Sequence, residues 1–227
     1  MDNKSKREMN DYYSNLLDIH GASRKALGRG FEDSYQQDQK FALLTGNNKI
    51  SSQASILDVG CGLGYLCEFF RAHGWKGSYT GVDINPMMIK SANKRLPQEQ
   101  FYCLDLLTDQ FDHKHDYVFC VATVQHKPKY SKEPDKYFKE MISKMFSLVN
   151  KALVFDVFSD RAEYYDEDNL YVNPVDLLSY CYSLTDRLVF RNDYRAYQIM
   201  VYLYKDLAVN ERNTYFDFDN PECRIAD

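Results

Sequence analysis

The chain has 227 residues, of which 28 are lysine or arginine and 33 are aspartate or glutamate, so its formal net charge is -5. This length and a 44% hydrophobic content suit a globular α/β protein with a real core, and they exclude disordered and collagen-like chains. The mild acidity argues against nucleic acid as a partner, because gripping a phosphate backbone needs clustered lysine and arginine.

The start of the chain, its apolar runs and its cysteines indicate the compartment. Residues 1–17 lack the apolar stretch of a signal peptide, and no uncharged apolar run approaches the roughly 20 residues that span a bilayer. The six cysteines are scattered and form no CxxC pair, so we expect reduced core residues without a disulfide or metal role. We therefore expect a cytoplasmic protein with no membrane partner.

Segments of strand and helix character alternate between residues 55 and 149. This alternation is the signature of βαβ units and predicts a parallel sheet. The predicted strands are short and nearly continuously apolar, which indicates burial on both faces. They span residues 55–59, 78–82, 100–104, 117–122 and 152–158.

Three helices are predicted between these strands, over residues 65–72, 86–95 and 134–149. Asn85 is the expected cap of the second helix, with Pro86 at its first position. The third helix repeats apolar side chains every three or four residues from Phe138 to Val149, which predicts one stripe facing the core.

Beyond residue 158 the pattern changes. An acidic, tyrosine-bearing loop over residues 160–171 precedes a predicted helix over residues 174–183. Two β-rich runs follow, 187–191 and 197–204, and their short connection predicts an antiparallel hairpin at the sheet edge. We expect residues 1–227 to form one domain, with a helical lead-in (1–50), a cofactor-binding core (51–158) and a substrate-side region (159–227).

A glycine-rich turn carries the chemistry. Residues 56–66, ILDVGCGLGYL, predict a buried strand that runs through a turn into a helix. Gly60 permits a tight turn, and Gly62 lets a ligand approach the main chain without a Cβ in the way. The spacing is GxGxG, and Tyr65 stands where the dinucleotide fingerprint has its third glycine. This tyrosine disfavours a nicotinamide cofactor.

Three aspartates lie at the carboxyl ends of successive predicted strands. Asp58 precedes the glycine turn, Asp83 is placed to accept both ribose hydroxyls of an adenosine, and Asp105 is placed to meet the exocyclic amine of an adenine. Alternatively, Asp58 and Asp105 cap turns, and Asp83 caps the helix that begins at Pro86. Their shared position at strand ends, where open sheets bind ligands, favours the cofactor site.

These motifs resemble those of the class I S-adenosylmethionine-dependent methyltransferases, in particular bacterial small-molecule methyltransferases. The resemblance covers residues 56–158 and is carried by ILDVGCGLG, GVDINPMMI, CLDLL and DYVFCVATVQH. It implies a Rossmann-like, doubly wound, seven-stranded, mostly parallel sheet with an antiparallel terminal hairpin and helices on both faces. It also implies S-adenosylmethionine as cofactor and S-adenosylhomocysteine as product. The implied cofactor contacts are Asp58, Gly60, Cys61, Gly62, Gly64, Asp83, Ile84, Asp105, Leu106 and Ala122.

The lead-in resembles that of some bacterial members of this family, through Tyr12-Tyr13, His20-Gly21 and the segment from Gln37 to Phe41. In those proteins the lead-in covers the cofactor and supplies a cation for its carboxylate. Arg24 or Arg29 is the candidate here, with Arg29 preferred. The alternative is that both are solvent-exposed charges of a linker.

His126 is the preferred candidate for a general base, because it follows Ala122 on the loop after the fourth strand and a histidine has a suitable pKa. It is equally placed to be an exposed loop residue, and His20 is the second candidate. His113 and His115 are interpreted as surface residues, and no metal site is expected because a third ligand is lacking. The candidates for an acceptor pocket wall are Tyr13, Tyr164, Tyr165, Tyr171 and Tyr194.

The predicted function is methyl transfer to an oxygen, nitrogen or carboxylate of a small-molecule acceptor. A methyltransferase of protein or nucleic acid is an alternative, but the Asn/Asp-Pro-Pro-Tyr/Phe sequence of such enzymes is replaced here by Ala-Thr-Val-Gln at residues 122–125. A protein that binds the cofactor without catalysis is a further alternative, as is a nicotinamide oxidoreductase or epimerase, which Tyr65 disfavours.

Overall fold

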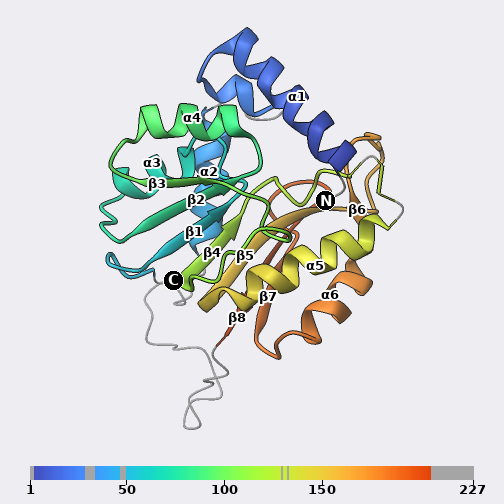
Figure 1. Ribbon diagram of the computed structural model, residues 1–227. Helices are drawn as coiled ribbons and strands as arrows, with labels where there is room; N and C mark the ends of the chain where they lie inside the picture. The colour runs from blue at the N-terminus through green and yellow to red at the C-terminus, as the bar shows by residue number, and fades with distance from the viewer. Residues whose placement is uncertain (1–2, 29–33, 47–49, 129, 132, 206–227) are drawn as a thin grey trace.

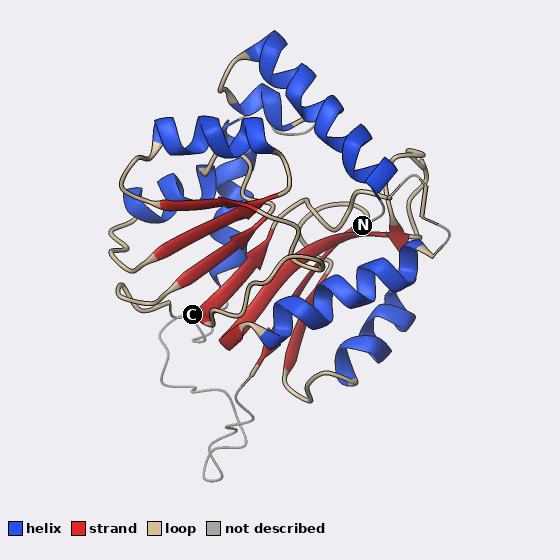
Figure 2. Cartoon of the chain, viewed as in Figure 1, coloured by secondary structure: helices blue, strands red, loops and turns tan. Residues whose placement is uncertain are grey.

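The computed structural model describes residues 3–28, 34–46, 50–128, 130–131 and 133–205. A twisted sheet lies between two layers of helices (Figures 1 and 2). Its strands are β1 Ile56–Val59, β2 Tyr79–Asp83, β3 Gln100–Cys103, β4 His115–Cys120, β5 Val149–Ser159, β6 Tyr171–Val172, β7 Leu188–Arg191 and β8 Gln198–Tyr204. The helices are α1 Asn3–His20, η1 Arg24–Leu27 (a 3-10 turn), α2 Ser34–Gly46, α3 Tyr65–Ala72, α4 Pro86–Arg95, α5 Pro134–Ser147 and α6 Pro174–Tyr182.

The strands follow the order β3-β2-β1-β4-β5-β8-β7, and β6 pairs with β5 outside this path. Strands β3, β2, β1, β4 and β5 are parallel neighbours, whereas β8 runs antiparallel to both β5 and β7. The predicted doubly wound sheet with a terminal antiparallel hairpin is confirmed. The two-residue strand β6 was not predicted. After β3 the chain passes back over β2 and β1 and forms β4 on the other side of β1. The loops after β1 and β4 therefore diverge, and open sheets bind ligands where two such loops diverge.

Alternating side chains of each strand bury against opposite helical layers. Leu57 of β1 belongs to the cluster packed with α5 and α6, and the neighbouring Ile56 belongs to the cluster packed with α2, α3 and α4. Both side chains are fully buried. This two-sided burial explains the nearly continuous apolar runs of the central strands.

Two helices begin at the caps that their sequences favour. The Asn85 side chain accepts hydrogen bonds from the Met87 and Met88 amides at 2.9 and 3.0 Å, and Pro86 occupies the first position of α4. The Asn173 side chain and Pro174 start α6 in the same way. Helices α3 and α4 have the bounds predicted from sequence, since a glycine or asparagine defines each start locally.

The junction between α5 and β5 differs from the prediction. Helix α5 ends at Ser147, and Val149 starts β5 by pairing with His115 of β4. Val149 is apolar and suits both the apolar stripe of a helix and a central strand. The prediction from periodicity alone therefore placed the end of the helix too late. His115, interpreted as a surface residue, is buried. Its Nε2 contacts Thr80 Oγ1 at 3.1 Å, so the Asp-His-Lys-His-Asp segment includes the first residue of a strand.

Strand β3 is also less buried than predicted. Only Phe101 of its four residues is buried, because β3 lies at the sheet edge and one side of it meets solvent. Cys103 is therefore exposed, contrary to the expectation of core cysteines, whereas Cys61, Cys67, Cys120 and Cys181 are buried and free. The remaining cysteine, Cys223, lies outside the described residues.

None of the helices in the described part of the chain combines the length and the apolar character that crossing a membrane requires.

A buried charge cluster joins three parts of the fold. Asp156 of β5 is fully buried, and its carboxylate lies 2.5 Å from the Lys40 ammonium of α2. The same carboxylate accepts hydrogen bonds from the Ala122 amide at 2.7 Å and from Gln125 Nε2 at 2.5 Å. Three donors thus compensate the loss of water around this charge, and they connect the lead-in, β5 and the loop after β4.

We expect Lys40→Met to lower the free energy of unfolding by roughly 3 kcal/mol, because it leaves the Asp156 carboxylate buried without its cation. Urea unfolding followed by circular dichroism measures this change. The matched control is Lys151→Met, whose partner Asp116 lies 3.4 Å away and whose side chain is 49% exposed, so its loss is expected to stay below about 1 kcal/mol. Equal losses in the two variants would contradict the interpretation.

Candidate functional site

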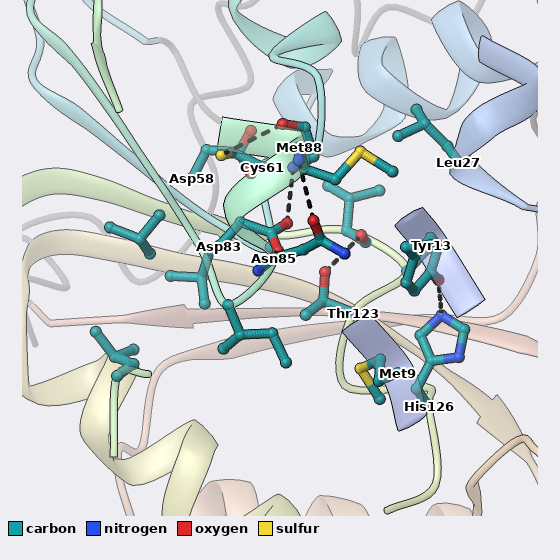
Figure 3. A pocket seen from close by; sticks show the side chains of 18 of the residues that line it. Met9, Tyr13, Leu27, Asp58, Cys61, Asp83, Asn85, Met88, Thr123 and His126 are labelled. Carbon is teal, nitrogen blue, oxygen red and sulfur yellow. Dashed lines mark hydrogen bonds between the residues drawn. The ribbon is translucent and has the colours of Figure 1, made fainter. Parts of the chain in front are cut away.

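A cavity of about 1110 Å³, including its open mouth, lies at the carboxyl ends of β1, β2 and β4 and beside α1 (Figure 3). Residues from the lead-in and from the sheet both contribute to its walls. The lining residues from the lead-in are Met9, Asn10, Tyr13, Leu27, Gln37 and Phe41. The remaining lining residues are Asp58, Val59, Gly60, Cys61, Gly62, Tyr65, Leu66, Val82, Asp83, Ile84, Asn85, Met88, Leu104, Asp105, Leu106, Val121, Ala122, Thr123, His126, Tyr137 and Met141.

The glycine turn after β1 lies close to two other segments of the chain. Gly60 has φ 76°, and a Cβ on it would lie 2.0 Å from Thr123 Oγ1 of the loop after β4. Only glycine therefore lets the two diverging loops meet. A Cβ on Gly62 would lie 2.8 Å from Leu27 of the lead-in, so this glycine admits η1 as well as facing the cavity.

Gly64 does not line the cavity, in contrast to the other predicted contacts in this turn. It precedes α3 with φ 78°, and a Cβ there would lie 2.9 Å from Leu96 and 3.0 Å from Phe101. Gly64 thus serves the packing of α3 against the neighbouring strand and helix in this structure.

Asp83 ends β2 with its carboxylate at the cavity wall (Figure 3). One oxygen accepts the Gly62 amide at 3.0 Å, and the other accepts the Asn85 amide at 2.8 Å. Burial raises the pKa of Asp83, and these backbone hydrogen bonds act in the opposite direction. The helix cap is Asn85 and not Asp83, which resolves the alternative left open by the sequence. Each Asp83 oxygen keeps a further lone pair for a ligand hydroxyl.

Asp58 lies deeper in the wall and is 3% exposed. Burial raises the pKa of Asp58 to about 7, despite the opposing hydrogen bond that the Tyr79 hydroxyl donates at 2.6 Å. The charge of Asp83 adds to the increase. A proton or a ligand cation near Asp58 therefore lowers the cost of burying this carboxyl group.

Asp105 caps a turn and lies at the cavity wall. Its side chain accepts the Leu107 amide at 3.1 Å, as a turn cap does, and it also lines the cavity. The Lys6 ammonium of α1 lies 3.7 Å from Asp105 Oδ2. The loop after β3 is thus linked to the lead-in, and Leu106 beside it supplies an apolar surface.

Ala122 is held in an unusual conformation at the centre of the site. It has φ 53°, a region that alanine rarely adopts, and its amide donates to the buried Asp156 carboxylate at 2.7 Å. The hydrogen bond to a charged acceptor offsets the strain of this backbone. Ala122 thereby turns the chain after β4 toward the cavity.

Tyr13 of α1 and His126 of the loop after β4 point toward each other (Figure 3). The Tyr13 hydroxyl lies 2.5 Å from His126 Nε2. Burial raises the pKa of Tyr13 and lowers the pKa of His126, so the tyrosine is protonated and the imidazole is neutral at pH 7. Tyr13 is therefore the donor, which assigns the imidazole proton to Nδ1.

The lead-in contributes more to the cavity than the sequence indicated. Tyr13, Gln37 and Phe41 belong to the segments of the lead-in that carry the family resemblance. Met9, Asn10 and Leu27 also line the cavity but were not predicted to do so. Asn10 Oδ1 is buried without a hydrogen-bond partner in the described part of the chain. A helix periodicity indicates that α1 has an apolar side, but not which element it packs against.

The predicted cations are not in the described cavity wall. The Arg24 guanidinium donates to Gln37 Oε1 and lies 3.1 Å from Asp38, so it connects η1 with α2 behind the wall. Arg29 lies outside the described residues. The described lining contains the acids Asp58, Asp83 and Asp105 and no lysine or arginine. Such a wall favours a ligand that carries positive charge and lacks phosphate.

The other candidates lie away from this cavity. His20 is exposed at the end of α1, and neither His113 nor the buried His115 reaches the lining. Among the tyrosines of the described ranges, the cavity is lined by Tyr13 of α1, Tyr65 of α3 and Tyr137 of α5. Within the described ranges, no group of three or more His, Cys, Asp or Glu side chains is arranged to hold a metal ion.

Part of the chain is similar to known methyltransferases. Residues 56–145 match the family model described as a methyltransferase domain. The malonyl-[acyl-carrier protein] O-methyltransferase of Acetivibrio thermocellus is 38% identical over 76 residues, which cover 33% of this chain and 27% of the relative. The enzyme of the same name from Anoxybacillus flavithermus is 32% identical over 111 residues, 47% of this chain and 40% of the relative. The matches therefore span less than half of these curated relatives.

Solved structures share the fold over most of the chain. Magnesium protoporphyrin IX methyltransferase (ChlM) from Synechocystis PCC 6803 with bound SAH superposes with TM-score 0.63 at 19% identity, covering 88% of this chain and all of that one. The DhpI-SAM-HEP complex gives TM-score 0.64 at 15% identity and covers 89% and 98%. The [4+2]-cyclase SpnF gives 0.62 at 16% identity and covers 83% and 74%. At these identities the likeness establishes the fold alone.

We expect Asp58→Asn to stabilise the protein increasingly between about pH 4 and about pH 7. In this range the folded wild type keeps a proton on Asp58, since its pKa is about 7, whereas the unfolded chain has released it. The wild type therefore loses roughly 1.4 kcal/mol of stability per pH unit through this residue, and the asparagine variant does not.

Urea unfolding of both proteins at about pH 5 and about pH 7.5 measures the difference. Asp112→Asn, whose side chain is 75% exposed, is the control. A stability difference between Asp58→Asn and wild type that is the same at both pH values would contradict the raised pKa.

Proposed function

From the match of residues 56–145 to the methyltransferase-domain family model, we propose that this protein transfers a methyl group from S-adenosylmethionine to an oxygen, nitrogen or carboxylate of a small molecule. The observation that carries the proposal is Asp83 at the end of β2. Its oxygens are anchored by two amides and keep lone pairs facing a cavity whose described wall is acidic and has no lysine or arginine. A ribose with two free hydroxyls and a nearby sulfonium fit that wall.

In this proposal, different residues of the chain contact different parts of the cofactor. Asp83 accepts the ribose hydroxyls, Asp105 and Leu106 face the adenine, and the turn from Gly60 to Gly62 holds the methionine part. Asn10, whose buried Oδ1 has no partner in the described chain, adds an acceptor from the lead-in. When bound, the cofactor supplies an electrophilic methyl group, and the protein supplies alignment and exclusion of water.

A nicotinamide cofactor fits this cavity less well. A pyrophosphate carries negative charge, and it would face Asp58 and Asp83, while no lysine or arginine is among the described residues that line the cavity. Tyr65 also lines the cavity, at the position that a dinucleotide site reserves for glycine. A protein that binds the sulfur cofactor without transferring its methyl group is the second candidate, since the same fold occurs in a [4+2]-cyclase.

We assign His126 the role of general base for an acceptor that carries a proton. Its neutral imidazole lines the cavity near Ala122, and its Nε2 has the lone pair that would take the proton. That lone pair accepts the Tyr13 hydroxyl, so an acceptor must displace Tyr13 or pass its proton through the tyrosine oxygen. Tyr13 is in this view a positioning residue, which fixes the tautomer of His126.

We expect S-adenosylhomocysteine to raise the melting temperature of the full chain, whereas NAD leaves it unchanged. Asp83→Ala should weaken binding of S-adenosylhomocysteine by roughly 1.5 to 3 kcal/mol, because the charge-assisted hydrogen bonds to the ribose are lost. Isothermal titration calorimetry measures the affinity, and Asp112→Ala outside the cavity is the control. If neither S-adenosylmethionine nor S-adenosylhomocysteine shifts the melting temperature, the proposed function is wrong.

His126 is tested by the pH dependence of turnover, once an acceptor has been found by screening for methyl release. The wild-type rate should rise with pH through the lowered pKa of His126 and then level off, since only the neutral imidazole accepts a proton. His126→Gln should lose this rise and roughly 100-fold or more in kcat. Tyr13→Phe should keep the rise, and His113→Gln serves as the control. An unchanged pH profile in His126→Gln would exclude the role.

A further inference from the structure

A second cavity, here called the outer cavity, adjoins the first at Gln37 and Ala122, which line both. It measures about 780 Å³ with its opening and lies at the carboxyl end of β5. Its walls come from α2, the loop after β4, the end of β5 and the chain before β8. The lining residues are Gln36, Gln37, Lys40, Ala122, Gln125, Phe158, Ala162, Tyr164, Tyr171, Arg195, Ala196, Tyr197 and Gln198.

Gln198 is a polar residue in a buried position of this wall. It begins β8 opposite Phe158 of β5 and shares a face with the apolar Met200 and Tyr202. The residue is 5% exposed, and its Oε1 has no hydrogen-bond partner in the described part of the chain. A buried acceptor without a donor costs about 1 to 3 kcal/mol. A ligand that donates a hydrogen bond into the outer cavity would remove this cost.

The charged side chains that line the outer cavity are both cations, Lys40 and Arg195. Lys40 is compensated by the buried Asp156 carboxylate at 2.5 Å. Arg195 is exposed, and no ion pair joins its guanidinium to another residue in the described ranges. Among the charged residues that line the outer cavity in the described chain, Arg195 therefore remains without an ion-pair partner. An anionic group on the occupant is complementary to it.

Aromatic rings form the apolar part of the outer cavity. The Phe158 and Tyr171 rings lie 5.6 Å apart between centroids with an interplanar angle of 32°. Tyr164 also lines the cavity but is 85% exposed, so it stands at the mouth. A planar, partly apolar body suits such a wall better than an aliphatic or fully polar one.

Backbone strain is concentrated at the same place. Ala122 and Tyr197 are the two non-glycine residues with positive φ among those described, at 53° and 61°, and both line the outer cavity. Each is fixed by a hydrogen bond: the Ala122 amide donates to Asp156, and the Tyr197 carbonyl accepts the Ser159 amide at 2.8 Å. Strained residues that the surroundings hold in place gather at ligand sites.

We propose that the outer cavity binds the methyl acceptor, and that this acceptor is a small aromatic acid bearing a hydroxyl or amino group. Its carboxylate meets Arg195, its ring lies against Phe158 and Tyr171, and its hydroxyl or amino group donates to Gln198 Oε1. Gln37 and Ala122, which line both cavities, join this binding site to the cofactor cavity that His126 lines. This inference rests on the proposed function for its catalytic meaning, whereas binding of the acid can be tested without turnover.

The test measures the affinity of three probes for the full chain saturated with S-adenosylhomocysteine, by NMR titration. The probes are 4-hydroxybenzoate, the uncharged 4-hydroxyacetophenone, and benzoate, which lacks the donor. We expect 4-hydroxybenzoate to bind about five- to tenfold more tightly than either of the others. Arg195→Gln should abolish its advantage over 4-hydroxyacetophenone, and Gln198→Leu should abolish its advantage over benzoate.

Arg161→Gln is the matched control, because it removes the same charge from a neighbouring exposed side chain that does not line the cavity. It should leave all three affinities unchanged. The proposal is overturned if the wild type shows no preference among the probes, or if Arg195→Gln and Arg161→Gln behave alike.

The affinity for S-adenosylhomocysteine, measured in every variant, separates the two hypotheses. An unchanged value shows that the variant is folded and that its cofactor cavity is intact. Failure of S-adenosylhomocysteine to bind the wild type would contradict the proposed function. The probe affinities would then be measured without S-adenosylhomocysteine, and a preference for the acid that depends on Arg195 would still support the outer cavity as an acid-binding site.

Discussion

The fully buried carboxylate of Asp156 is the constraint on which the arrangement of both cavities depends. A charge removed from water must be compensated by donors, and here they come from α2, from the Ala122 amide and from Gln125. Because the donors come from α2 and from the loop after β4, satisfying one carboxylate of β5 fixes the lead-in against the sheet and turns that loop. The Ala122 backbone at the junction of the two cavities is consequently held where an alanine would not rest by itself.

The fold could be predicted largely from sequence because its determinants are local. Asn85 with Pro86 defines the start of α4, the glycine turn defines the start of α3, and apolar runs mark the central strands. The predictions are wrong where the local sequence pattern is compatible with more than one structure. Val149 suits either a helix stripe or a strand, and pairing with β4 chooses the strand. The exposure of Cys103 follows from the edge position of β3, which depends on the order of the whole sheet.

The candidate site divides in the same way. The acids at the ends of β1, β2 and β3 could be predicted to lie together, since the carboxyl ends of parallel strands share one edge of a sheet. The positions of Met9 and Asn10 in the cavity wall could not be predicted. The Tyr13–His126 contact could not be predicted either, because it joins segments more than 100 residues apart in sequence. Gln198 had a weak signal, as a polar residue in a row of alternating apolar side chains of β8. Its missing partner becomes visible only when the whole neighbourhood is known.

The position of α1 has a consequence for the lifetime of a bound ligand. This helix forms part of the cavity wall, yet its buried apolar contact with the rest of the protein is a small cluster of Leu17, Ala26, Leu63 and Met88, separate from the two cores of the sheet. A segment with so little buried surface opens at a lower free energy than the strands beneath it. The residence time of a ligand in the cavity is therefore governed by how often α1 undocks, independently of the slower global unfolding of the sheet.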